Sequence, residues 1–361
     1  MSLRSIILCA LLIVVIGANA SAQTSVRLEA VYREPADTFE ILDNVSNWWP
    51  GYNEAPYREY WSDSFGISPA DSVLFARYAQ LRERYFDKTG QQNDDPGTSR
   101  SGLFTDRAAL NADPVGFSFY ASESMDEAFD RLDQIVEPDE IAFLRSFYDH
   151  FASLTGPLTA ETERLVSASL ASTQRTLRAP ELATYLGEVG AFFGVSADVT
   201  FTALYVWWPD AEQIMANPNG PFLLLRIRPF EGEVVNSADI VAHEAVHVVS
   251  AMQSDAQKRA VSDTMLEACS GALDFTGRLD VIEEPLATVL GNVEVQRRFD
   301  PGRFRWSRDW YGTPWVNLSA RVLYPVVLDA LAAGETIAGS FSAEAASLCA
   351  TVVDAMATRR D

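Results

Sequence analysis

The amino-acid sequence predicts an α+β fold that is predominantly helical, with one small sheet near the middle of the chain. Helix signals dominate residues 67–195 and return after residue 237. Residues 199–229 instead combine β-branched, aromatic and leucine side chains, which favour strands. The chain has 361 residues, of which 48% are hydrophobic and 22% charged. It is therefore long enough for one large globular domain or two modest ones.

Residues 1–22 have the pattern of a secretory signal. Arg4 supplies a positive start, an unbroken apolar run follows from Ile6 to Ile16, and small residues end the segment at Ala20 and Ala22. The apolar run is too short to span a bilayer comfortably. We therefore predict a signal peptide over 1–22, a secreted or periplasmic mature protein, and no stable membrane insertion once the signal is removed. An uncleaved N-terminal anchor is the alternative.

Residues 23–195 are predicted to form a mainly helical N-terminal region. Alternation of apolar and polar residues over 24–32 indicates a short opening strand. Ser68 and Ser124 are placed to begin helices, because a serine side chain can accept free backbone N–H groups there. Residues 87–114, rich in Gly, Asn, Asp and Ser, form the longest loop, either a flap or a mere insertion. Helices are predicted over 67–86, 124–136, 138–154, 159–177 and 180–195.

Residues 196–361 are predicted to form a second region, in which strands are followed by helices. Residues 199–208 and 221–229 have strand composition, and the three leucines of the second run predict burial on both faces. Between them, Asn-Pro-Asn-Gly at 217–220 is typical of a turn. Ser237 is a good N-cap for the helix that follows. Helices are predicted over 238–253 and 257–275, and the C-terminal part is helical except for a structured loop at 298–317.

The net charge and the cysteines limit which partners and which compartment the sequence allows. The formal net charge is −22 and the isoelectric point is about 4.5. Such a surface repels phosphate backbones, so we expect no nucleic-acid partner. Cys269 and Cys349 remain after removal of the signal. An oxidising compartment permits one disulfide between them, and two buried free thiols are equally compatible with the sequence.

The strongest chemical signal is a His-Glu-x-x-His motif at residues 243–247. His243 and His247 are four residues apart on the predicted helix, so their imidazoles project from one face and can bind one tetrahedral zinc ion. Glu244 is one residue further round and can reach a water on that metal as a general base. The surrounding helix is almost uncharged, and unpartnered polar groups there would be costly. A buried histidine pair satisfied by hydrogen bonds is the alternative interpretation.

A catalytic zinc needs a third protein ligand, and Glu267 is the predicted one. Its neighbours on the next helix are apolar, and Gly271 lies one turn further on the same face, where two helices could approach closely. Cys269 is the rival ligand. Asp274 is a candidate hydrogen-bond acceptor for a ligand histidine. His150, the remaining histidine, belongs to a separate upstream helix and is more simply a surface residue.

With these residues in view, the chain resembles the gluzincins, the thermolysin-like zinc peptidases. His243, Glu244, His247 and Glu267 carry the resemblance, which covers about residues 199–277. It implies a zincin-like core with a small sheet next to the motif helix. It also implies that the strand at 221–229 borders the cleft and pairs with an extended substrate. One departure is Gly271, where the familiar pattern has an aspartate.

These observations predict a secreted zinc-dependent metallopeptidase that cleaves peptide or protein substrates with Zn²⁺ as cofactor. Glu244 would be its general base, and His243, His247 and Glu267 its metal ligands. Tyr311 or Tyr324 could donate a hydrogen bond to the developing oxyanion, while a plain core aromatic is the favoured interpretation of either one taken alone. Two alternatives remain open. One is a zinc-binding protein of the same fold without peptidase activity, such as a binding module or a hydrolase of non-peptide amides. The other is a helical interaction protein without metal.

Overall fold

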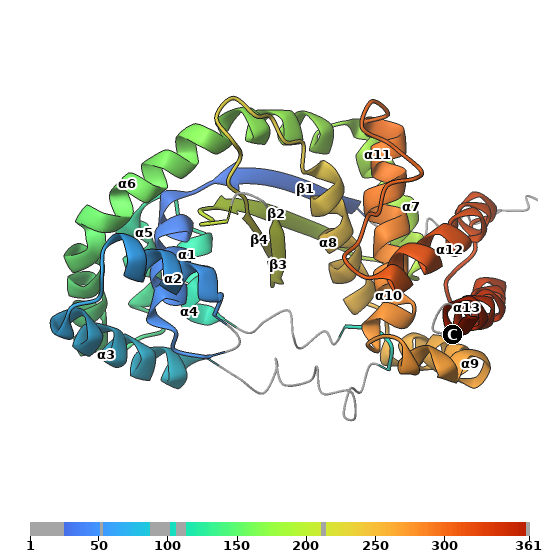
Figure 1. The fold of residues 1–361 in the computed structure, drawn as a ribbon, viewed down its shortest axis with the longest axis horizontal. Coiled ribbons are helices and arrows are strands. Elements are labelled where there is room, and N and C mark those ends of the chain that lie inside the picture. Colours follow the sequence, from blue (N-terminus) through green and yellow to red (C-terminus); the bar gives the residue numbers. More distant parts are fainter. Residues whose placement is uncertain (1–24, 51–52, 87–101, 106–112, 211–213, 359–361) are drawn as a thin grey trace, which may run out of the picture.

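The structure is a computed structural model that describes residues 25–50, 53–86, 102–105, 113–210 and 214–358. Helices dominate it, and one four-stranded sheet lies between the two halves of the molecule (Figure 1). The predicted fold class, a predominantly helical α+β protein with a small sheet, is therefore confirmed. The predicted signal peptide and most of the loop predicted over 87–114 lie outside the described residues.

The helices predicted in the first half are present, and three others, over 34–46, 55–64 and 114–120, were not predicted. Ser68 and Ser124 accept hydrogen bonds from the backbone N–H groups of Asp71 and Glu127, so both helices begin where expected. The two helices predicted over 138–154 and 159–177 are one helix of 40 residues that tolerates Pro157 inside it. The helices are α1 (Glu34–Ser46), α2 (Ala55–Ser64), α3 (Pro69–Tyr85), α4 (Pro114–Tyr120), α5 (Met125–Leu132), α6 (Pro138–Leu177) and α7 (Pro180–Phe192).

The second half is also mainly helical. The helix predicted over 257–275 is an α-helix followed by one 3-10 turn, Ser270–Asp274. A second 3-10 turn is Leu279–Val281, and a π-helix, Thr288–Val293, joins two α-helices into one continuous element. The α-helices are α8 (Ala238–Ala251), α9 (Asp255–Cys269), α10 (Glu283–Ala287), α11 (Glu294–Phe299), α12 (Pro314–Ala333) and α13 (Ser340–Thr358).

The sheet has the strand order β1-β2-β4-β3. β1 (Ser25–Tyr32) and β4 (Phe222–Arg226) run parallel to β2 (Asp198–Val206), which lies between them, whereas β3 (Met215–Asn219) pairs antiparallel with β4. The three predicted strands are therefore present. The turn predicted at 217–220 is wrong for its first three residues, which belong to the edge strand β3. The chain reverses at Gly220, whose positive φ of 61° suits a glycine.

The sheet separates two hydrophobic cores. Leu223 and Leu225 of β4 face one core and Leu224 faces the other, because successive strand residues point to opposite faces. Burial of this strand on both faces is thus confirmed. One core is built by α1 to α5 and the first half of α6. The other is built by α7, α8 and the C-terminal helices, and α6 arches over both (Figure 1).

The two predicted regions, 23–195 and 196–361, share this sheet. β1 comes from the first region and pairs along its whole length with β2 from the second. α7, from the first region, packs into the same core as α8. Residue 195 therefore does not divide two separate cores in the described part of the chain.

Helix α1 carries acidic groups into the interior, and each has a specific partner. Asp43 accepts a hydrogen bond from Arg82, which also pairs with Asp113, at 2.6 and 2.7 Å. Glu40 pairs with Arg226 at 2.9 Å. Buried charges of this kind stabilise a fold only when their partners are all in place. The network therefore fixes α1 against the end of the sheet.

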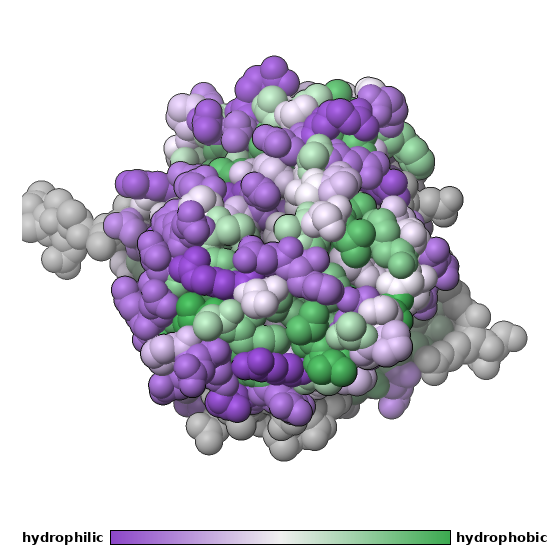
Figure 2. Space-filling view, turned by 90° about the vertical axis from the view of Figure 1, so that its left-hand side faces the viewer, coloured by the Kyte–Doolittle hydropathy of each residue, from purple (hydrophilic) through white to green (hydrophobic). Residues whose placement is uncertain are grey.

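The outer face of this half, on the side of α3 and α6, mixes hydrophilic side chains with a hydrophobic area (Figure 2). Exposed large hydrophobic side chains of the first half include Phe65, Val73 and Ile135. Scattered exposed apolar residues are ordinary for a globular protein.

Two features bear on the compartment. Cys269 of α9 and Cys349 of α13 form a disulfide, which resolves the choice left open by the sequence. Among the described helices, α12 is long and apolar enough to cross a membrane by length and composition alone. Its side chains at Trp315, Val316 and Ala320 are buried in the core, as in a central helix of a globular domain.

Candidate metal centre

Helix α8 carries the motif and is buried on nearly every side. Ser237 stands at its N-cap, although its side chain makes no capping hydrogen bond, and Asp239 lies in the first turn. Valines and alanines occupy most other positions and pack into the core beneath the sheet. The helix predicted over 238–253 therefore exists, and it ends at Ala251. Its burial leaves the two histidines to find partners inside the protein.

His243 and His247 face the same point. Their Nε2 atoms are 3.2 Å apart, and only 7% and 9% of the two side chains are exposed. This arrangement follows from their spacing, since residues four apart lie one above the other on a helix. The predicted pairing of the two histidines is thus present.

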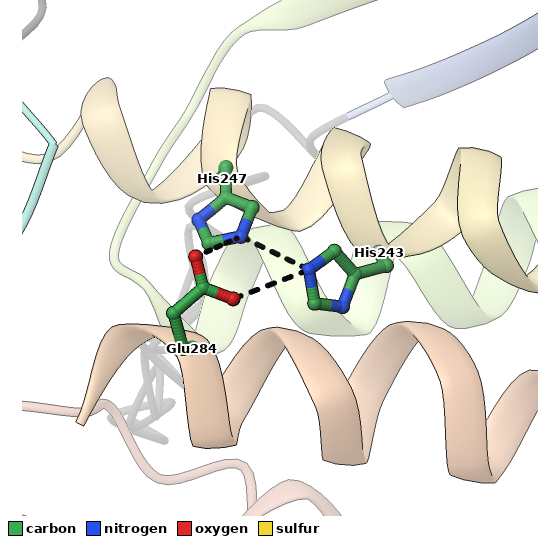
Figure 3. Close-up of side chains that lie close together, drawn as sticks. All are labelled: His243, His247 and Glu284. Atoms are coloured by element: carbon green, nitrogen blue, oxygen red, sulfur yellow. Dashed lines mark hydrogen bonds and ion pairs between the residues drawn. The ribbon is translucent and has the colours of Figure 1, made fainter. Parts of the chain in front are cut away.

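Glu284, at the start of α10, completes the group. Its Oε2 lies 3.4 Å from Nε2 of His243, and its Oε1 lies 3.4 Å from Nε2 of His247. Figure 3 shows the carboxylate pointing up at both rings from the neighbouring helix. One ligand atom from each residue lies within 4.8 Å of the others, so the three could hold one metal ion.

The separation of the two histidine nitrogens suits a tetrahedral zinc ion. Ligand atoms about 2.0–2.1 Å from a tetrahedral metal lie about 3.3 Å from each other. The two Nε2 atoms are 3.2 Å apart, and each lies 3.4 Å from a different oxygen of Glu284. Two imidazoles and a carboxylate also form a common catalytic zinc set, which leaves a fourth position open. The donors present therefore fit zinc in chemistry, and the two imidazoles fit it in spacing.

The structure does not bring Glu267, the predicted third ligand, to the two histidines. Glu267 is exposed on α9 and does not belong to the group formed with the histidines. Gly271, which was expected to let α9 approach the motif helix, faces Val353 of α13 instead. Cys269, the rival ligand, is bound in the disulfide. Asp274, the predicted hydrogen-bond acceptor for a ligand histidine, is exposed. Glu283 instead contacts Nδ1 of His247.

Glu284 reaches the site because its helix packs unusually close to α8. Gly291, in the π-helix two turns beyond Glu284, lies against the backbone of Ala242 and His243, where a side chain would clash. Turns of π-helix inside α-helices are frequently found at functional sites. The sequence did contain a signal for this ligand, namely a glutamate among apolar residues with a glycine on the same helical face. Glu267 and Gly271 show the same pattern and lie nearer to the motif in sequence, which favours them when the sequence is considered alone.

A second carboxylate orients His247. Glu283, whose side chain is 1% exposed, places Oε1 2.9 Å from Nδ1 of His247. Its Oε2 accepts a hydrogen bond from the backbone N–H of Thr105 at 2.5 Å. An acceptor on Nδ1 favours the tautomer that leaves Nε2 free to bind a metal. By contrast, Nδ1 of His243 is buried without a hydrogen-bond partner among the described residues.

His247 and Glu284 each stabilise the charged form of the other. Burial disfavours the charged form of His247, but the charge of Glu284 and the hydrogen bond to Glu283 outweigh it and raise the pKa of His247 well above its usual range. Burial also disfavours ionised Glu284, yet the charge of His247 holds the pKa of Glu284 well below its usual range. The site is thus arranged to keep positive charge beside an ionised carboxylate.

Glu244 is partly exposed and lies beside the group without joining it. Burial raises the pKa of Glu244, while the nearby charges of His243 and His247 act to lower it. A carboxylate with a raised pKa is a better proton acceptor near neutral pH. Glu244 therefore has the chemistry of a proton acceptor, and its electrostatic neighbours include both histidines.

Of the two tyrosines considered from the sequence, one faces the site. The ring of Tyr311 stacks on His243, with centroids 5.9 Å apart. Burial and then the charge of Glu284 raise the pKa of Tyr311, so its hydroxyl stays protonated and able to donate. Tyr324 instead donates to Glu294 at 2.9 Å. His150 is exposed on α6 and contacts Asp71 at 2.8 Å, far from the motif in the fold.

Comparisons with known proteins found no match for this chain. No protein-family model matches the chain, and neither the curated proteins nor the solved structures contain a match. The relation to gluzincins therefore stays a resemblance carried by individual residues.

Proposed function

We propose that the chain is a secreted zinc-dependent metallopeptidase. The observation that carries the proposal is the convergence of His243, His247 and Glu284, whose donor atoms lie close enough to share one metal ion, with Glu244 next to His243 on the same helix. A zinc ion bound there would polarise a scissile carbonyl and acidify a water molecule. The resemblance to gluzincins supports the same conclusion, with Glu284 in the role first assigned to Glu267.

The chain's own residues divide the remaining chemistry. Glu244 takes a proton from the attacking water and delivers it to the leaving amine. Tyr311 presents its hydroxyl beside His243 and donates to the oxygen on which negative charge develops. Glu283 holds His247 in the tautomer that presents Nε2.

The strand that was expected to pair with an extended substrate is not free to do so. The strand at 221–229 corresponds to β4, which is internal because it pairs with both β2 and β3. β3 is the edge strand next to β4, and it contacts α8. An edge strand offers free backbone groups to an extended peptide, so we assign backbone recognition to β3. Pro218 within β3 removes one donor from that edge.

The disulfide supports the proposed location. A bridge between Cys269 and Cys349 suits an oxidising compartment such as the periplasm or the cell exterior. The acidic surface suits a soluble exported protein, and no nucleic-acid partner is proposed.

Substitution of the general base tests the proposal. Glu244→Gln should retain about one equivalent of zinc and lose roughly 10²- to 10⁴-fold in the rate of peptide cleavage, because it removes proton transfer but no ligand. Glu344→Gln, on the exposed face of α13, is the matched control and should cleave at the native rate. A Glu244→Gln variant that keeps zinc and full activity would show that the assigned mechanism is wrong.

The same measurements separate the alternatives. Wild-type protein that binds zinc but cleaves no peptide in a broad library would favour the binding module or a hydrolase of other amides. Protein that contains less than about half an equivalent of zinc under metal-replete conditions would favour the interaction protein without metal.

A further inference from the structure

A short piece of chain from the first half of the sequence is inserted into the core beside the candidate metal centre. In the segment Gly102–Thr105, the side chains of Leu103 and Phe104 are 0% and 1% exposed. They belong to the same hydrophobic core as α8 and α9. The segment is therefore docked by apolar contacts and is not a passing surface loop.

Hydrogen bonds fix the position of this segment. The N–H of Leu103 donates to Oγ of Ser262 at 2.9 Å, and Nζ of Lys258 donates to the carbonyl of Thr105 at 2.7 Å. Gly102 has a φ of 66° and lies so close to Ser262 that a side chain would not fit. The contacts on both sides hold the backbone of Thr105 in one place.

The N–H of Thr105 is directed at the outer partner of the metal centre. It donates to Oε2 of Glu283 at 2.5 Å, while Oε1 of Glu283 contacts Nδ1 of His247 at 2.9 Å. Glu283 is almost fully buried, so water cannot replace a lost partner. One backbone group, one carboxylate and one imidazole thus form a continuous chain that ends at Nε2 of His247.

We propose that the backbone N–H of Thr105 is a positioning group for the metal centre. It fixes the carboxylate of Glu283, and Glu283 fixes the ring of His247 so that Nε2 faces the metal position. This inference rests on the proposed zinc site. Outer partners of this kind typically change metal affinity by about 10- to 100-fold when they are removed. Without Thr105, one oxygen of Glu283 would be buried without a donor, and the carboxylate would be free to turn.

Proline and alanine at position 105 give a matched pair, because proline alone removes the backbone N–H. Zinc affinity is measured by competition with a chelator, and ligand geometry by the absorption spectrum of the cobalt-substituted protein. Thr105→Pro should bind zinc about 10-fold or more weakly and alter the cobalt spectrum. Thr105→Ala should match the wild type in both. Equal losses in the two variants, or no loss in Thr105→Pro, would overturn the proposal.

Proline also restricts the backbone, so a second experiment separates loss of the hydrogen bond from misfolding. Glu283→Gln is measured alone and together with Thr105→Pro, each with melting of the metal-free protein as the check on folding. If Thr105 acts through Glu283, the losses of zinc affinity in the two single variants should not add, because both changes act in one network. The affinity of the double variant should then lie within about 2-fold of the lower of the two single-variant affinities. Fully additive losses would overturn the proposal.

The outcome is distinct from failure of the proposed function. If wild-type protein binds no zinc, the metal site itself is wrong. If wild-type protein binds zinc and Thr105→Pro binds it equally well, the zinc site stands and the positioning role falls.

Discussion

Gly291 lies directly against the backbone of His243: a methyl group on Gly291 would be 2.2 Å from the Cα atom of His243. This contact joins the helix that carries the two histidines to the helix that carries Glu284. The convergence of the three side chains depends on it, because the missing side chain lets the two helices approach this closely.

Gly291→Ala should therefore damage the site from a position without ligand chemistry. Forcing the helices apart should lower the free energy of unfolding by about 1–3 kcal/mol and weaken zinc binding. Gly156→Ala in α6 is the control, since no atom lies within 4 Å of its added methyl group. It should be neutral or slightly stabilising, because alanine favours helix more than glycine does. Denaturant unfolding and zinc titration check both variants, and native zinc affinity in Gly291→Ala would contradict the packing argument.

The disulfide should support stability without serving the metal. Cys269 and Cys349 are separated by 80 residues in sequence, so the bridge restricts a long loop of the unfolded chain. Replacing both cysteines with serine should lower the free energy of unfolding by about 2–4 kcal/mol. Zinc affinity of the folded variant should stay native, because neither sulfur lies in the candidate site. Loss of zinc binding in a folded variant would revive Cys269 as a ligand.

The buried carboxyl of Asp37 predicts a pH dependence of stability. Burial raises the pKa of Asp37 to about 7, and the charge of Glu40 adds to the rise, although the N–H of Trp207 and the hydroxyl of Tyr32 donate hydrogen bonds that act to lower the pKa. The folded protein therefore keeps a proton that the unfolded chain loses above pH 3.8. The free energy of unfolding should fall as pH rises from about 4 to about 7, by at most about 1.4 kcal/mol per pH unit from this group.

Asp37→Asn removes this titration and should flatten the pH profile of unfolding in that window. Asp130→Asn is the control, because the Asp130 side chain is 78% exposed. Urea unfolding at several pH values measures both. A profile unchanged by Asp37→Asn would show that another group causes the dependence.

Local features of the fold and the site could be predicted from the sequence. Ser68 and Ser124 begin helices through contacts with residues three positions away, and His243 and His247 converge because they are one helical turn apart. Such relationships need no knowledge of the tertiary structure. The strand at 221–229 was also predicted as buried on both faces from its leucines.

The third ligand could not be chosen by local reasoning alone. Glu267 and Glu284 both lie among apolar neighbours and have a glycine on the same face, so their sequence patterns are alike. Only the packing of α9 against α13, fixed by the disulfide, turns Glu267 to solvent. The role of Thr105 was equally hidden, because its side chain is unremarkable and its backbone N–H makes the contact.

Zinc affinity in two glutamate variants tests the central claim most directly. Glu284→Gln removes a proposed ligand charge, whereas Glu267→Gln changes an exposed glutamate of α9 in the same way. We predict that wild-type protein and Glu267→Gln each bind about one equivalent of zinc with equal affinity. Glu284→Gln should bind it at least 100-fold more weakly, since a buried ligand is lost. Native affinity in Glu284→Gln, or a loss confined to Glu267→Gln, would contradict the assignment of the metal centre.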